Sequence, residues 1–138
     1  MSIEANKALL RRYYDELWCK GNDDAADELL HPEFNDPELP ADWPSGVEGF
    51  KRLVREWRQG FPDMRETVEH MIAEGDKVVG YFRMRGTHEG EFFGIAPTGK
   101  RVEMVGADVA RIANGKIAEL WYAEDLLGLY RQLGAVEG

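Results

Sequence analysis

The sequence is short of cysteine, histidine and long hydrophobic runs, and each shortage excludes a class of site or location. Cys19 is the single cysteine, so neither an intramolecular disulfide nor a cysteine-based metal site can form. The histidines His31, His70 and His88 are scattered without metal-ligand spacing, which predicts no metal site. No apolar run approaches the roughly 18 residues of a membrane span, and residues 1–10 lack a signal-peptide pattern. We therefore expect a soluble, cytoplasmic protein that does not bind membranes.

Positive charge is also scarce. The chain has 17 Lys and Arg against 26 Asp and Glu, giving a net charge of −9 at pH 7. A protein that binds nucleic acid needs surplus basic side chains to neutralise phosphates, so nucleic acid is not an expected partner. The length of 138 residues and the hydrophobic content of 43% predict one folded domain, residues 1–138, with a proper core.

The first sixty residues show helical periodicity in three stretches, 3–20, 23–30 and 47–60. The apolar side of the first stretch consists of Leu10, Tyr13, Tyr14, Leu17 and Trp18. Ser45 and Glu48 have the spacing of a capping box that opens the third helix. Residues 32–46 are rich in proline, and a long irregular loop inside a small domain is often functional. We interpret this segment as a loop over the mouth of a cavity.

The hydrophobic period changes from 3.6 to 2 after residue 63. Strands are predicted over 64–73 and 77–88, followed by a hairpin around the Asn114-Gly115 turn. Helices followed by an antiparallel meander make an α+β fold, with three N-terminal helices packed on one face of a curved antiparallel sheet. The opposite face, which alternation gives to Val79, Tyr81, Val105 and Val109, is the expected surface for dimerisation.

Asp108 is the principal candidate for chemistry. Alternation places it on the same strand face as Met104, Gly106 and Ala110. A carboxylate on an apolar face loses solvation, which raises its pKa and makes it a candidate proton carrier. The alternative is that this face lies at a wet sheet edge, or that backbone donors satisfy the carboxylate.

Three segments of the chain resemble the SnoaL-like polyketide cyclase family of the NTF2-like superfamily. They are ANKALLRRYYDELWCKGN near the start, EGEFFGIAPTGKRV in the middle and RIANGKIAELWYAEDLLGLYRQLG at the end. The resemblance implies a cone-shaped NTF2-like domain with a deep cavity between helices and sheet. It also implies a homodimer, no metal and no organic cofactor.

In the founding members of that family, a carboxylate on the last long strand is the acid/base of an intramolecular aldol ring closure, and a histidine on the preceding strand lies nearby. Alignment on RIANGKI places the histidine position at Asp108 and the carboxylate position at Tyr122, so this chain departs at both. We expect Asp108 and Tyr122 to face inward on adjacent strands and to interact. Asp108 could then take an acidic α-proton while Tyr122 donates to the enolate oxygen. Alternatively, Tyr122 merely satisfies a buried Asp108.

Two further residues match the family and are candidate catalytic groups, each with a structural alternative. Asp125 follows the last strand, where it could instead cap a terminal helix. His88 precedes the Gly-rich loop, where it could instead be a structural hydrogen-bond partner. Side chains expected to line the cavity are apolar or aromatic and suit a flat, small hydrophobic ligand: Tyr14, Trp18, Trp57, Phe82, Met84, Met104 and Leu120.

Three functions remain open from the sequence. The first is a cofactor-independent cyclase or isomerase that acts on a small apolar carbonyl or polyketide-like compound. The second is a non-catalytic protein that holds a hydrophobic ligand in the same cavity. The third is an epoxide hydrolase, which would require a second inward acid, such as Asp125, and an arginine beside Asp108.

Overall fold

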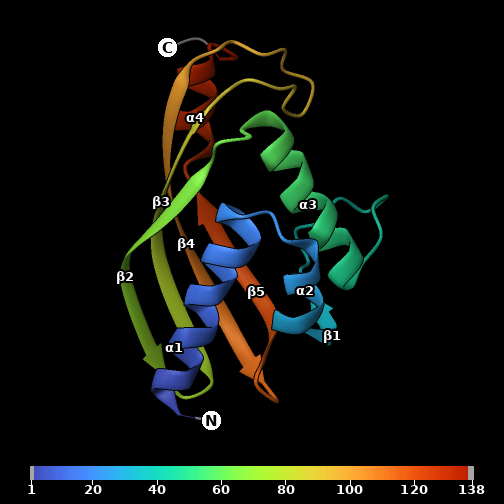
Figure 1. Ribbon diagram of the computed structural model, residues 1–138, viewed down its shortest axis with the longest axis vertical. Coiled ribbons are helices and arrows are strands. Elements are labelled where there is room, and N and C mark those ends of the chain that lie inside the picture. The colour runs from blue at the N-terminus through green and yellow to red at the C-terminus, as the bar shows by residue number, and fades with distance from the viewer. Residues whose placement is uncertain (1, 137–138) are drawn as a thin grey trace.

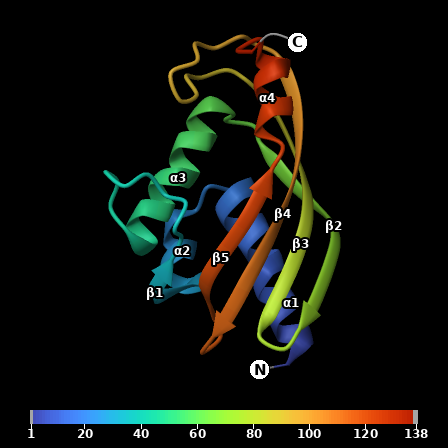
Figure 2. The same ribbon diagram turned by 180° about the vertical axis from the view of Figure 1, so that it is seen from behind.

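Five strands form a single sheet, and the helices of the N-terminal half, up to α3, cover one of its faces (Figures 1 and 2). The computed structural model describes residues 2–136. The elements in chain order are α1 (Ile3–Arg12), the π-helical η1 (Tyr13–Cys19), α2 (Asp23–Leu29), β1 (Leu30–Asn35), α3 (Gly46–Gly60), β2 (Arg65–Glu74), β3 (Lys77–Thr87), β4 (Arg101–Ala113), β5 (Lys116–Glu124) and α4 (Leu126–Leu133). The α+β class and the predicted helices and strands are confirmed.

The sheet has the order β1-β5-β4-β3-β2 and is mixed rather than purely antiparallel. Strands β2 to β5 form the predicted antiparallel meander, but β1 runs parallel to β5. The prediction of a loop beginning at residue 32 was therefore wrong at its start. Pro32 suggested a break in structure, yet β1 lies at the edge of the sheet, where a residue without an N–H is tolerated.

The helix ends follow the sequence with one exception. Asn22 accepts a hydrogen bond from the Asp24 amide and caps α2, where the predicted second helical stretch begins. Ser45 occupies the N-cap of α3, but its side chain makes no capping hydrogen bond. The predicted capping box is not formed because Glu48, which should reach back to Ser45, contacts Lys51 at 3.3 Å instead.

The hairpin between β4 and β5 turns at Asn114-Gly115, as predicted. Both residues have positive φ, 54° and 73°, which a type I′ turn requires. A register shift between Arg111 and Ile112 lies close to the turn, and beyond this shift Asp108 lies opposite Tyr122. The hairpin therefore places both candidate residues on adjacent strands, as expected.

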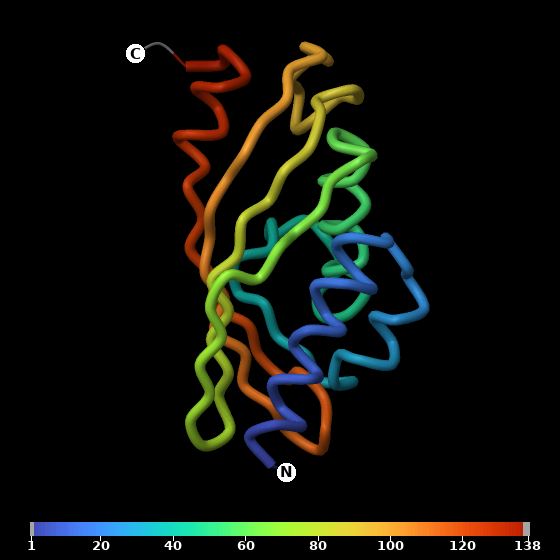
Figure 3. The backbone as a smooth tube through the Cα atoms, turned by 60° about the vertical axis from the view of Figure 1, so that its left-hand side comes forward, coloured from blue at the N-terminus to red at the C-terminus, as the bar shows by residue number. Residues whose placement is uncertain are grey.

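The core lies between the helices and one face of the sheet. We call this the inner face; it carries Val78, Phe82, Met84, Met104 and Ala110, which are all buried. The opposite, outer face carries Val79, Tyr81, Val105 and Val109, which are half-buried. Figure 3 shows α4 on the side of the sheet opposite α1 to α3. Among residues 2–136, no helix is long and apolar enough to cross a membrane.

Candidate active site

A small cavity opens on the inner face beneath α3 and η1. Its wall is aromatic and apolar with an acidic patch, and is formed by Tyr13, Trp18, Phe50, Leu53, Trp57, Glu66, Phe82, Met104, Asp108, Tyr122 and Glu124. Its free volume is about 20 Å³, little more than one water molecule occupies. A ring-shaped ligand can therefore enter only when side chains of the wall move.

Asp108 faces this cavity from the middle of β4. Its Cα is paired with Gly80 on β3 and with Tyr122 on β5, and only 5% of the residue is exposed. The Tyr14 hydroxyl donates a hydrogen bond to Asp108 Oδ2 over 2.6 Å. Burial raises the pKa of Asp108 to about 7, and the nearby charge of Asp36 adds to the effect, while the Tyr14 hydrogen bond opposes it. The predicted burial of this carboxyl is confirmed, and a hydroxyl rather than backbone donors satisfies it.

Gly80 is the reason that Tyr14 can reach Asp108. A Cβ at position 80 would lie 2.5 Å from the Tyr14 hydroxyl oxygen, so the missing side chain leaves the space that the hydroxyl occupies. The π-helical segment contributes from the other side, because it turns the neighbouring Tyr13 and Tyr14 both into the core. π-Helical turns of this kind are frequent at functional sites.

The expected pair of Asp108 and Tyr122 is not hydrogen-bonded. The Tyr122 hydroxyl instead donates to Asp36 Oδ2 over 3.0 Å. Asp36 directly follows β1, is buried, and also accepts from the Glu38 amide. Two separate carboxyl–phenol pairs thus replace the single predicted one. No sequence pattern indicates Asp36, because its segment, residues 32–46, is predicted to be an irregular loop.

Two more carboxyl groups, Glu66 on β2 and Glu124 at the end of β5, line the same cavity. Burial raises the pKa of Glu66 well above its usual range, and the charges of Asp108 and Glu124 add to the shift. Burial, followed by the repulsion of Asp108, raises the pKa of Glu124 to about 7. Strand alternation could have found Glu66, since it lies between Met64 and Val68 on the inward-facing positions.

No Lys, Arg or His is among the residues that line the cavity. The carboxyl groups are therefore not neutralised by a basic side chain of the wall, and an apolar environment strengthens their mutual repulsion. Carboxyl groups in this situation hold protons, because the neutral form does not repel its neighbours. The cavity can thus take up and release protons near neutral pH.

Comparison with known proteins agrees with this architecture. The SnoaL-like polyketide cyclase family matches residues 8–133. The chain belongs to this family. Aklanonic acid methyl ester cyclase DauD from Streptomyces sp. (strain C5) is 31% identical over 133 residues, which cover 91% of this chain and 80% of DauD. The cyclase DnrD from Streptomyces peucetius is 31% identical over 129 residues, covering 91% of this chain and 88% of DnrD. TsrD from Streptomyces laurentii has a similar structure, with a TM-score of 0.90, 30% identity and 99% coverage of both chains.

Two of the residues that match the family by sequence lie outside the cavity wall. His88 is fully buried beside Phe61, and its Nδ1 lies 3.0 Å from the Thr98 hydroxyl and 3.2 Å from the Thr98 amide. Asp125 is exposed and accepts a hydrogen bond from the Gly128 amide at the start of α4. His88 thus forms hydrogen bonds to the Gly-rich loop, and Asp125 caps a helix. These contacts correspond to the structural alternative given for each residue.

The arrangement that an epoxide hydrolase would require is not formed. Asp125 does not line the cavity, and no arginine does. Of the apolar residues expected to line the cavity, Trp18, Trp57, Phe82 and Met104 do so. Tyr14 contacts the cavity carboxyl Asp108 from behind, while Met84 and Leu120 are buried in the core. Sequence reasoning did not include Tyr13, Phe50 or Leu53 in the wall.

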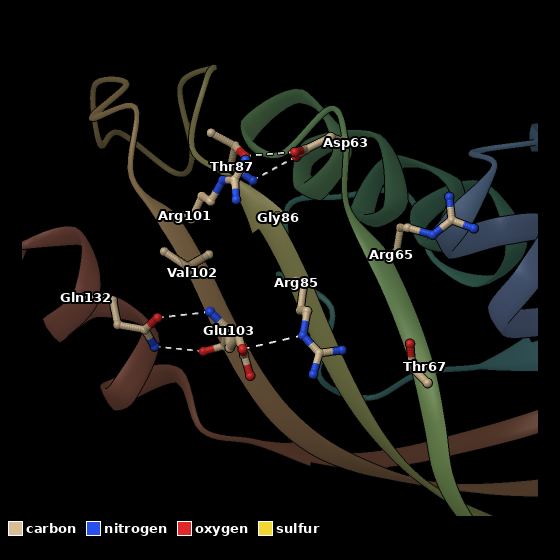
Figure 4. A pocket seen from close by; sticks show the side chains of 10 residues that line it. All are labelled: Asp63, Arg65, Thr67, Arg85, Gly86, Thr87, Arg101, Val102, Glu103 and Gln132. Carbon is tan, nitrogen blue, oxygen red and sulfur yellow. Dashed lines mark hydrogen bonds and ion pairs between the residues drawn. The ribbon is translucent and has the colours of Figure 1, made fainter.

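A second, larger hollow is a groove of about 680 Å³ on the outer face between α4 and strands β2 to β4. Figure 4 shows its polar lining, in which Gln132 binds the Glu103 backbone and Arg85 contacts the Glu103 carboxylate at 3.4 Å. The Asp63 carboxylate accepts hydrogen bonds from the amide and the hydroxyl of Thr87. The acids of this groove already have partners, so its chemistry differs from that of the inner cavity.

Proposed function

We propose that the protein is a cofactor-independent acid/base enzyme that closes a ring in a polyketide-like carbonyl compound. The observation that carries this proposal is the buried carboxyl of Asp108, which faces an aromatic cavity and has a pKa of about 7. A base with a pKa near the working pH combines a useful ionised fraction with sufficient basicity. Membership of the SnoaL-like polyketide cyclases supports the type of substrate.

Asp108 is the proposed base. Its Oδ2 is held by Tyr14, and Oδ1 makes no hydrogen bond to residues 2–136, so Oδ1 is available to remove an acidic α-proton from the substrate. Tyr122 is the proposed donor to the enolate oxygen. Because its hydroxyl is bonded to Asp36, it must exchange that hydrogen bond for one to the substrate.

The experiment that tests this function uses aklanonic acid methyl ester, the compound named for the relatives DauD and DnrD, as the first probe. We expect cyclisation that rises as pH increases through about 7, since only the ionised Asp108 can accept the proton. Asp108→Asn should lose this activity. Asp125→Asn is the matched control, because asparagine caps a helix as well as aspartate does and the residue lies outside the cavity. Equal activity of Asp108→Asn and wild type on this or any other substrate would contradict the proposal.

A non-catalytic binding protein is the second candidate. It is favoured by the two phenol–carboxyl pairs, Tyr14 with Asp108 and Tyr122 with Asp36, which satisfy each other in the absence of a ligand. The two functions differ in what a tightly binding aromatic ketone does in D₂O. An enzyme exchanges the α-protons of the ketone for deuterium in a manner that depends on Asp108, whereas a binding protein leaves them in place.

We further propose that the protein is a homodimer that associates through the outer face. Ile72, Val79, Val109 and Trp121 are consecutive Cα partners and form an apolar row across four strands of this face. Ile72 is 67% and Trp121 40% exposed, which is unusual for such large apolar side chains. Light scattering should give the dimer mass for the wild type and a lower mass for Ile72→Glu. Leu127→Glu on α4, where Leu127 is 52% exposed, is the control that should remain dimeric. A monomeric wild type would exclude this interface.

A further inference from the structure

We propose that Glu66 is the general acid of the cavity, donating its carboxyl proton to the substrate carbonyl oxygen that becomes an alkoxide when the ring closes. This inference rests on the proposed function, in which Asp108 is the base. It assigns catalytic work to a residue on β2, a strand on which the sequence had indicated no functional group.

The backbone of Glu66 is held by Cys19, while its carboxyl group is left without a partner. Its amide donates to Cys19 Sγ over 3.3 Å, and Cys19 Sγ lies 3.5 Å from its carbonyl oxygen. The side chain lies on the inner face in register with Met84 of β3, which is in register with Met104 of β4. Its Oε1 is buried and has no hydrogen-bond partner. A buried polar atom without a partner costs stability, so an empty position beside it is a site that a ligand atom can fill.

The other polar groups of the cavity contrast with Glu66 in this respect. The hydroxyls of Tyr14 and Tyr122 are already bonded to Asp108 and Asp36. Tyr122 must therefore break a hydrogen bond before it can donate to a substrate, and Glu66 need not. The free carboxyl is the group best placed to meet a substrate oxygen that enters the cavity.

The protonation state of Glu66 suits an acid. The neighbours of Glu66 along its row of the sheet are the methionines Met84 and Met104. No basic side chain lines the cavity, and Asp108 and Glu124 are the charged groups that face Glu66. Burial and the repulsion of these two carboxylates raise the pKa of Glu66 well above its usual range. The raised pKa favours the neutral form of Glu66, which carries the O–H that a donor needs, as buried carboxylic acids do in other enzymes that stabilise enolates.

The proton balance of the reaction closes with these two groups. Asp108 takes the proton from the α-carbon, and the resulting carbanion forms a carbon–carbon bond to the acceptor carbonyl. The oxygen of that carbonyl takes the proton of Glu66 and becomes a hydroxyl. Asp108 is then protonated and Glu66 ionised, and transfer of one proton between these neighbouring carboxyls restores the starting state without any co-reactant.

The first test measures the hydrogen bond directly and requires no turnover. Acetophenone is the probe, and the C=O stretching frequency of the bound ketone is recorded by infrared difference spectroscopy. A hydrogen bond from Glu66 lowers this frequency in the wild type and in Asp125→Asn, which lies outside the cavity, and Glu66→Leu abolishes the shift. The proposal would be overturned if the shift survived in Glu66→Leu, or if acetophenone did not bind at the highest concentration that its solubility allows.

The second test measures rates with aklanonic acid methyl ester and the same variants. Loss of a general acid costs about 10²–10⁴-fold, so Glu66→Leu should fall by that factor in kcat, while Asp125→Asn should keep the wild-type kcat. The wild-type rate should also fall as pH rises through the raised pKa of Glu66, and Glu66→Gln should lack this decline. Full kcat in Glu66→Leu together with an inactive Asp108→Asn would refute the role of Glu66 and leave the proposed function intact. Full activity in both variants would refute the function itself.

Discussion

The two faces of the sheet differ in how their charged side chains are paired. On the outer face, Arg111 contacts Glu119 at 2.6 Å, and Arg83 contacts both Glu69 and Glu103 at 3.2 Å. On the inner face, Glu66, Asp108 and Glu124 share a cavity without a basic residue in its wall.

The difference between the faces is the reverse of what stability alone would select. Ion pairs at the surface contribute little, because water solvates their charges well without a partner. Buried charges without a partner are costly. The carboxyl groups of the inner face are therefore retained at a cost in stability, which is the common situation for groups that perform chemistry.

The largest effect that we predict is the loss of activity in Asp108→Asn. Asparagine can still accept the Tyr14 hydrogen bond, so the geometry of the cavity is kept while the base is removed. Cyclisation should fall by about 10²–10⁴-fold. Steady-state kinetics on purified protein provides the measurement, and Asp125→Asn should retain the wild-type rate.

The same substitution should stabilise the fold at alkaline pH. The pKa of Asp108 is raised from 3.8 to about 7, so the folded state binds the proton more tightly than the unfolded state. The stability linked to this group is present below about pH 4 and is lost as pH rises through about 7. The unfolding free energy of Asp108→Asn should exceed that of the wild type by up to about 4 kcal/mol at pH 8. Urea unfolding at pH 5 and pH 8 tests this, and an equal difference at both pH values would count against it.

Gly80→Ala should disrupt the contact between Tyr14 and Asp108. The new methyl group would occupy the place of the Tyr14 hydroxyl, and overpacking of this kind typically costs about 1–3 kcal/mol. Loss of the hydrogen bond should also raise the pKa of Asp108 further, because that bond favours the ionised form. The pH dependence of cyclisation should therefore shift to higher pH. Gly75→Ala is the matched control for the glycine change, because nothing lies within 4 Å of a Cβ there, although its positive φ brings some strain.

The smallest effect is expected on the outer face. Arg111→Ala removes the ion pair with Glu119, and both side chains are about one-third exposed. The unfolding free energy should fall by less than about 1 kcal/mol, and the difference should shrink in high salt. A cost as large as that of Gly80→Ala would mean that the two faces do not differ as described.

The sequence predicted those parts of the site that depend on periodicity. Alternation along residues 100–113 identified Asp108 as inward-facing, and the Asn114-Gly115 turn placed its strand beside that of Tyr122. The exact pairing of the two residues also depends on the register shift between Arg111 and Ile112, which no local pattern indicated. The same rule applied to residues 64–68 would have identified Glu66.

The hydrogen-bond partners could not be predicted. Tyr14 and Asp108 are separated by 94 positions, and their contact depends on the space that Gly80 leaves and on the π-helical turn. Asp36 follows an edge strand that contains a proline, so no local pattern indicated it. Such contacts arise from the packing of separate elements, which a reading of local patterns does not determine.

The most direct test of this account is an NMR titration of the side-chain carboxyl carbons in protein labelled with ¹³C at Asp and Glu. It requires no substrate, and Asp108→Asn, Glu66→Gln and Glu124→Gln assign the signals. The account predicts that Asp108 and Glu124 titrate near pH 7 and that the pKa of Glu66 lies well above the usual range of a glutamate. If Asp108 and Glu66 were both fully ionised at pH 5, the cavity would hold no proton to exchange and the account would be contradicted.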